Sequence, residues 1–143
     1  MAHETTLRWQ GDMAFDAELD GHHFALDADE AVGGKNLGPR PKGLLLSALA
    51  GCTGMDVVAL LRNRKMPFDS FSVKVDADST EEHPKVYSAI RIEYRFTGSQ
   101  LDAEKIKKAI QLSRERYCGV SAMLAKAAPI THTVVLNGQP LAG

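Results

Sequence analysis

A chain of 143 residues is long enough to bury the core of one domain and too short for two, so we expect a single domain over residues 1–143. Its 17 basic and 18 acidic residues nearly balance, and no basic patch or charged tail favours nucleic acid as a partner. The opening residues, MAHETTLRWQ, lack the cationic and then apolar pattern of a secretory signal, which predicts a cytoplasmic protein.

The first part of the chain is expected to form a three-stranded meander. The strands are predicted at residues 5–9, 13–19 and 22–26. Asp20-Gly21, between the last two strands, is a strong signal for a two-residue hairpin turn. From Asp27 to Lys42, acidic residues, glycines and prolines replace any periodic pattern, which predicts a surface loop.

Residues 43–65, GLLLSALAGCTGMDVVALLRNRK, predict the long helix around which the fold is organised. The segment is apolar on nearly every side of a helical wheel, as in a core helix. At about 1.5 Å per residue it would be roughly 35 Å long. The run from Leu44 to Met55 is uncharged, but Asp56 interrupts it before the roughly 20 residues that a bilayer requires. We therefore expect no membrane association.

The second half of the chain predicts a hairpin, two further helices and a last strand. Residues 68–78 and 86–96 alternate between apolar and polar side chains, which indicates a long antiparallel hairpin with one wet face. Asp102 is the expected N-cap of a helix over residues 103–117. A short helix and a strand are predicted at residues 120–128 and 131–136. This order predicts an α+β domain, and the central helix is apolar enough to suggest that a second subunit packs on it.

The chain has two cysteines, Cys52 in the middle of the central helix and Cys118 where the second helix ends. Their separation fits neither a zinc motif nor a disulfide scaffold. In a reducing cytosol such a pair is either two inert buried thiols or a redox pair. The histidines lack the spacing of metal ligands, so no metal is expected.

The segment GPRPKGLLLSALAGCTGMDVVALLRNRK, together with ERYCGV around Cys118, resembles the OsmC/Ohr family of thiol-dependent hydroperoxide reductases. It is most similar to the OsmC-like branch in which a Met-Asp-Val stretch follows the cysteine. The resemblance implies antiparallel sheets wrapped around a long central helix, in an intertwined homodimer with its active site at the subunit interface. It also implies that Cys52 is the peroxidatic cysteine and Cys118 the resolving cysteine, which form a disulfide during the reaction.

The reaction that the resemblance implies needs no bound cofactor, because an external dithiol restores both thiols. The leucines and Met55 of the central helix would give the site an apolar wall, which suits an organic hydroperoxide better than hydrogen peroxide.

A peroxide-reducing thiol must be ionised, and burial disfavours the charged form, so the site needs a positive charge. In the resembled family, a glutamate ten residues before the first cysteine pairs with an arginine that holds the thiolate. Here that position is Lys42. Arg40 is the leading candidate for the activating cation, with Lys42 and Arg8 behind it, and each of them could instead be a solvated surface residue. Asp56, one turn after Cys52, could steer a proton, bind a cation or pair with a neighbouring element.

Two functions remain open from the sequence. The first is a cytoplasmic homodimeric peroxidase that defends against oxidative stress by reducing organic hydroperoxides at Cys52 and Cys118. The second is a noncatalytic protein of the same fold that binds an apolar small molecule in the dimer groove, with both cysteines packed in the core. Lys42 favours the second function, and the paired cysteines favour the first.

Overall fold

The computed structural model describes residues 2–142. The chain divides between Leu45 and Leu46 into two compact units. The expectation of a single domain stays a prediction.

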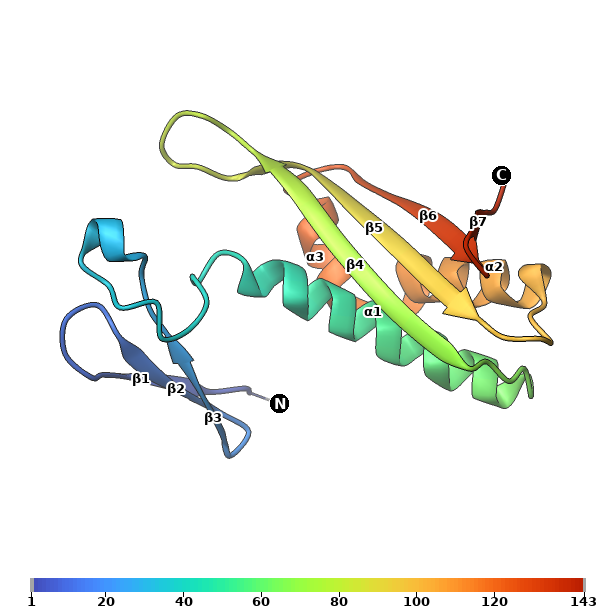
Figure 1. The fold of residues 1–143 in the computed structure, drawn as a ribbon, viewed down its shortest axis with the longest axis horizontal. Coiled ribbons are helices and arrows are strands. Elements are labelled where there is room, and N and C mark those ends of the chain that lie inside the picture. The colour runs from blue at the N-terminus through green and yellow to red at the C-terminus, as the bar shows by residue number, and fades with distance from the viewer. Residues whose placement is uncertain (1, 143) are drawn as a thin grey trace. The chain divides into compact units, whose positions relative to one another are not determined.

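The first unit contains the predicted antiparallel meander, with strand order β1-β2-β3 (Figure 1). Its strands are β1 (Thr5–Trp9), β2 (Phe15–Leu19) and β3 (His22–Leu26). Asp20 and Gly21 have φ values of 52° and 77°. Two successive positive φ values are what a type I′ turn requires, so the hairpin signal in the sequence is confirmed.

The loop after β3 is more ordered than its composition indicates. It contains a short 3-10 helix, η1 (Glu30–Val32), and it is organised by the buried side chain of Asp27. This carboxylate accepts hydrogen bonds from the backbone N–H groups of Ala28, Lys35 and Leu37. The bond from Ala28 contributes most to holding the pKa of Asp27 below its usual range. An acid that satisfies several backbone donors leaves no periodic signal in a sequence.

The second unit is a four-stranded sheet with helices along it (Figure 1). Helix α1 (Leu44–Asn63) starts in the last two residues of the first unit and continues through the second. The elements that follow it are β4 (Ser70–Ser79), β5 (Tyr87–Thr97), α2 (Ala103–Leu112), η2 (Ser113–Tyr117), α3 (Gly119–Ala125), β6 (Ile130–Leu136) and β7 (Gln139–Pro140). The strand order is β4-β5-β6-β7, with β4 antiparallel to β5 and β6 parallel to β5. The α+β class is confirmed. The sheet is mixed because it contains this parallel pair. The helices between β5 and β6 return the chain to the edge of the sheet where β5 begins, so β6 runs in the same direction as β5.

One face of this sheet is buried and the other is polar, as the alternating sequence predicts. On β5, the buried side chains are Ile90, Ile92, Tyr94 and Phe96. The next positions lie on the opposite face, where Arg91 donates hydrogen bonds to Asp76 and Asp78 of β4. The helices complete the core with Leu49, Val57 and Leu61 of α1 and Ile106, Ala109 and Ile110 of α2.

The predicted central helix is confirmed as α1. Within a single chain, only one stripe of its surface is buried. Its buried residues are Leu49, Thr53, Gly54, Val57 and Leu61. A Cβ on Gly54 would lie 3.4 Å from Val73 Cγ2, so this stripe of the helix packs against β4. On the remaining surface, Met55 is 76% exposed.

Within the described residues, α1 is the one helix that is long and apolar enough to cross a membrane by length and composition. The core helix of a soluble protein meets the same two criteria. The expectation of no membrane association stays a prediction.

The second helix begins as predicted and ends differently. The Asp102 side chain accepts hydrogen bonds from the N–H groups of Glu104 and Lys105, so the N-cap is confirmed. The α-helix then widens into the π-helical segment η2. A π turn shifts the helical register, so Tyr117, which an ordinary helix would place on the same face as Ile110 and Ser113, is 52% exposed. Ser113 stays buried at the start of this segment.

Candidate functional site

The two cysteines meet beside the third turn of α1. The sulfur atoms of Cys52 and Cys118 and a carboxylate oxygen of Asp56 all lie within 4.8 Å of one another. Cys52 and Asp56 are four residues apart on one helix, so their side chains share a face. Cys118 reaches them from the junction between η2 and α3. The fold therefore places two sequence-distant thiols within reach of each other.

Both thiols are free, and their surroundings differ. Cys118 is only 3% exposed, whereas Cys52 is partly exposed. Burial is the largest of the effects that raise the pKa of Cys118 to about 11, followed by its interaction with the Cys52 thiol. A hydrogen bond from the Ser121 N–H acts in the opposite direction, and the negative charge of Asp56 adds to the rise. Cys118 is therefore protonated at neutral pH.

A buried chain of hydroxyl groups holds the Asp56 carboxylate. Ser113 Oγ donates to Asp56 Oδ2 at 3.0 Å, so its oxygen is left to accept a hydrogen bond. Thr53 Oγ1 lies 2.8 Å from Ser113 Oγ and 2.8 Å from the Tyr94 hydroxyl. Each hydroxyl has one proton to donate, and Ser113 uses its proton on Asp56. Thr53 must therefore donate to Ser113, and Tyr94 must donate to Thr53. Desolvation is the main reason that the pKa of Tyr94 is raised, which keeps this donor protonated.

The sequence did not predict these hydrogen bonds between hydroxyl groups. Thr53, Ser113 and Tyr94 come from α1, the start of η2 and β5, and only the tertiary structure brings them together. A hydroxyl-bearing side chain at an inward-facing position of each of the three elements was the one available signal.

The candidate activating cations lie in the first unit. Arg40 Nη1 donates to Asn36 Oδ1 at 2.8 Å and to the Gly38 carbonyl at 2.9 Å. Arg8 pairs with Glu18 at 3.0 Å. These contacts do not test whether either arginine activates Cys52, so the role of Arg40 stays a prediction.

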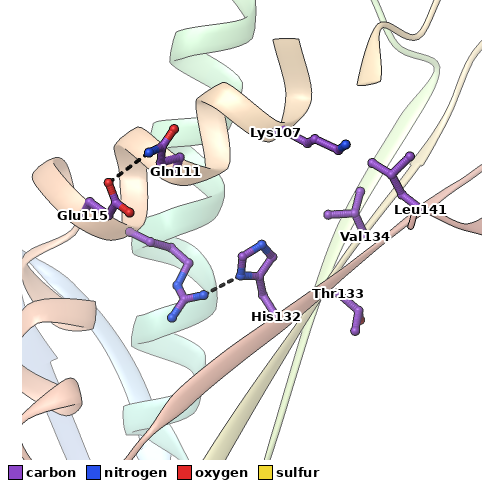
Figure 2. Close-up of a pocket in the computed structure, with 8 residues that line it drawn as sticks. Lys107, Gln111, Glu115, His132, Thr133, Val134 and Leu141 are labelled. Carbon is purple, nitrogen blue, oxygen red and sulfur yellow. Dashed lines mark hydrogen bonds between the residues drawn. The ribbon is translucent and has the colours of Figure 1, made fainter. Parts of the chain in front are cut away.

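A cavity of about 680 Å³ lies between the second helix and β6, apart from the cysteines. Figure 2 shows its lining residues Lys107, Gln111 and His132, with Gln111 donating a hydrogen bond to Glu115. Arg114 also lines it and hydrogen-bonds to His132 Nδ1 and to the Ile130 carbonyl. Desolvation and the Arg114 charge hold the pKa of His132 below its usual value. Since neither thiol lines this cavity, the sequence-predicted site is a separate one.

Comparison with known proteins gives the family of this chain. The family model described as OsmC-like protein matches residues 33–133. This chain belongs to the OsmC-like family. The match includes Cys52, Asp56 and Cys118, and the family resemblance in the sequence is confirmed.

Three known proteins show the range of similarity to this chain. Protein YhfA of Escherichia coli K12 is 31% identical over 131 residues, covering 91% of this chain and 95% of that protein. A hypothetical protein from Aquifex aeolicus has a TM-score of 0.81 at 24% identity, with 96% and 98% of the two chains covered. An organic hydroperoxide resistance protein from Elizabethkingia anophelis has a TM-score of 0.72 at 13% identity, with 96% and 97% covered. At these identities the two structures show a shared fold.

Proposed function

We propose that this OsmC-like protein reduces organic hydroperoxides by a two-cysteine mechanism. The observation that carries the proposal is the approach of the Cys52 and Cys118 sulfurs to within 4.8 Å. The E. anophelis protein, named for organic hydroperoxide resistance, shares this fold and supports the choice of substrate class.

In the proposed reaction, the Cys52 thiolate attacks one peroxide oxygen and the O–O bond breaks. The leaving alkoxide takes up a proton and departs as an alcohol, while Cys52 becomes a sulfenic acid. Cys118 loses its proton and attacks this sulfur, so that a disulfide forms and water leaves. An external dithiol then reduces the disulfide by exchange, becomes oxidised itself, and restores both thiols.

The two roles follow from burial and protonation. Cys52 is the more exposed thiol and is the one a substrate can reach. Cys118 is buried, and its raised pKa keeps it as a thiol until a sulfenic acid is present beside it. We also propose that Arg40, the leading candidate in the sequence, supplies the cation that Cys52 needs, in a cytoplasmic protein that protects against oxidative stress.

The direct test is peroxide consumption by the wild-type chain with dithiothreitol as reductant. We expect turnover of cumene hydroperoxide with a kcat/KM at least about tenfold above that for hydrogen peroxide, because the wall formed by α1 is apolar. Consumption of the peroxide is followed directly by a colorimetric peroxide assay. Absence of consumption with several dithiols would contradict the enzymatic proposal.

A second candidate function is supported by an apolar cavity of about 440 Å³ on α1. Gly51, Gly54, Met55, Val58 and Phe71 are among its lining residues. A noncatalytic protein could hold an apolar small molecule there. Binding of a hydrophobic fluorescent probe, without any peroxide consumption, would favour this function over the first.

We also propose that two copies of the chain pair through α1. Its buried stripe leaves Met55 76% exposed among small residues, which would allow two helices to approach closely. If two copies pair around a twofold axis, the exposed apolar face of α1 in each copy is buried against the same face of the other.

Replacing Met55 by glutamate is expected to separate the dimer. A carboxylate placed in an apolar helix interface would weaken association by at least about 100-fold. Light scattering after size-exclusion chromatography measures the mass. Met123→Glu is the matched control, because Met123 is 66% exposed on α3. Wild-type and control chains should run as dimers, and a monomeric wild type or a dimeric Met55→Glu chain would contradict the proposal.

A further inference from the structure

We propose that Cys52, Asp56 and Cys118 form a binding site for one thiophilic divalent cation, Zn²⁺, in the reduced chain. Each side chain offers one ligand atom, and the three atoms lie within 4.8 Å of one another. A tetrahedral zinc centre with sulfur at about 2.3 Å and oxygen at about 2.1 Å separates its ligand atoms by roughly 3.6–3.8 Å. Each pair of ligand atoms therefore has to close by at most about 1.2 Å to reach that geometry.

The placement of the three ligands suits a metal centre. Cys52 and Asp56 lie one turn apart on α1, the spacing by which one helix presents two ligands to one ion. Cys118 supplies the third ligand from a different element, at the start of α3. Two sulfurs and one oxygen favour zinc over magnesium or calcium, which prefer oxygen alone. Three protein ligands leave a fourth position open for water.

Groups around the site already orient the ligand atoms. Ser113 Oγ donates to one oxygen of Asp56 at 3.0 Å, and Thr53 Oγ1 lies 2.8 Å from Ser113 Oγ. The Ser121 N–H donates to Cys118 Sγ at 3.3 Å. Hydrogen bonds of this kind fix metal ligands in known sites, and their loss commonly weakens metal affinity by about 10- to 100-fold.

A cation would also explain why an acid lies beside two thiols. Metal binding deprotonates both thiols, and a divalent cation offsets the repulsion that two thiolates and one carboxylate within 4.8 Å would otherwise have. The peroxide chemistry makes no use of Asp56. Reasoning from the sequence expected no metal because neither the spacing of the histidines nor the separation of the two cysteines fits a metal motif, whereas this site forms only when the fold brings two cysteines and an acid together.

Zinc binding and disulfide formation use the same sulfurs, so each excludes the other. Bound zinc is therefore expected to protect both cysteines from oxidation. The inference does not depend on the proposed peroxidase, because it is tested without any peroxide.

The test is a calorimetric titration of the reduced full-length chain with Zn²⁺, under anaerobic conditions and against a competing chelator. We expect one zinc ion per chain, bound at least about tenfold more weakly by Cys52→Ser, Cys118→Ser and Asp56→Asn. The control is Glu104→Gln, because the Glu104 side chain is 85% exposed on α2. Its affinity should equal that of the wild type.

A second measurement shows whether the sulfurs coordinate the metal. Co²⁺ added to the reduced chain should give a thiolate-to-cobalt charge-transfer absorption that weakens with either cysteine change. Circular dichroism verifies that each variant is folded. The proposal is overturned if the wild type binds no stoichiometric zinc, if the charge-transfer absorption is absent, or if Asp56→Asn binds as tightly as Glu104→Gln.

Discussion

Replacing Cys52 by serine should abolish peroxide consumption, with a loss of at least about 1,000-fold in kcat/KM. A serine hydroxyl stays protonated at neutral pH, because the neighbouring Asp56 carboxylate is too weak a base to ionise it, whereas a thiolate attacks peroxides directly. The change removes little volume, so the chain should stay folded. Ser47→Ala, an exposed position on the same helix, is the matched control and should keep wild-type activity.

Cys118→Ser should show a different defect. Cys52 still attacks one peroxide, but its sulfenic acid finds no thiol to condense with, so each chain consumes one equivalent and slows. Mass spectrometry should then find one added oxygen on Cys52 and no intramolecular disulfide, while the wild type gives the disulfide. Undiminished turnover by Cys118→Ser, or by Cys52→Ser, would contradict the assigned roles.

The distinction between these two variants depends on the surroundings of the thiols. Cys118 is buried, and the rise in its pKa makes it a poor first nucleophile at neutral pH. Its position beside Cys52 makes it an effective second one, because the reaction within one chain needs no encounter. A wild-type disulfide without peroxide consumption would instead indicate a thiol switch.

The elements of the fold were predictable because local patterns encode them. Alternation gave β4 and β5, the Asp20-Gly21 turn gave the hairpin, and the Asp102 cap gave the start of α2. The parallel pairing of β6 was not predictable in this way, since strand direction depends on how the intervening helices cross the sheet. The π-helical turn at Ser113 was also missed, because its sequence continues the pattern of an ordinary helix.

The candidate site was predictable only in part. The motif around Cys52 and the Tyr-Cys pair ending at Cys118 identified the two sulfurs, and the structure brings them together. Asp56 was noticed from its helical spacing, but its partner Ser113 is distant in the sequence. Hydrogen bonds between distant residues leave no periodic signal, so the sequence could not predict the hydrogen bonds that link Tyr94 to Asp56.

Replacing Thr53 by valine should lower the free energy of unfolding by about 2–3 kcal/mol. Thr53 is fully buried, and its hydroxyl joins the Tyr94 hydroxyl to Ser113 Oγ. Valine keeps the shape but leaves a buried Tyr94 donor without its acceptor and removes one donor from Ser113, at a cost of about 1–3 kcal/mol for each buried group left unpaired. Thermal unfolding should show a Tm lower by roughly 5–10 °C.

Two comparisons separate a lost hydrogen-bond chain from a general packing defect. Thr131→Val, at an exposed position of β6, should change stability by less than about 0.5 kcal/mol. In a Tyr94→Phe background, Thr53→Val should lower the free energy of unfolding by at least about 1 kcal/mol less than in the wild type. The reason is that the Tyr94 hydroxyl, which would be left without an acceptor, is already absent. Equal costs in both backgrounds would mean that Thr53 acts by packing alone. If they differ, the protons of Tyr94, Thr53 and Ser113 form one connected chain that ends on the carboxylate beside the two sulfurs, and the stability of the core and the orientation of Asp56 depend on the same bonds.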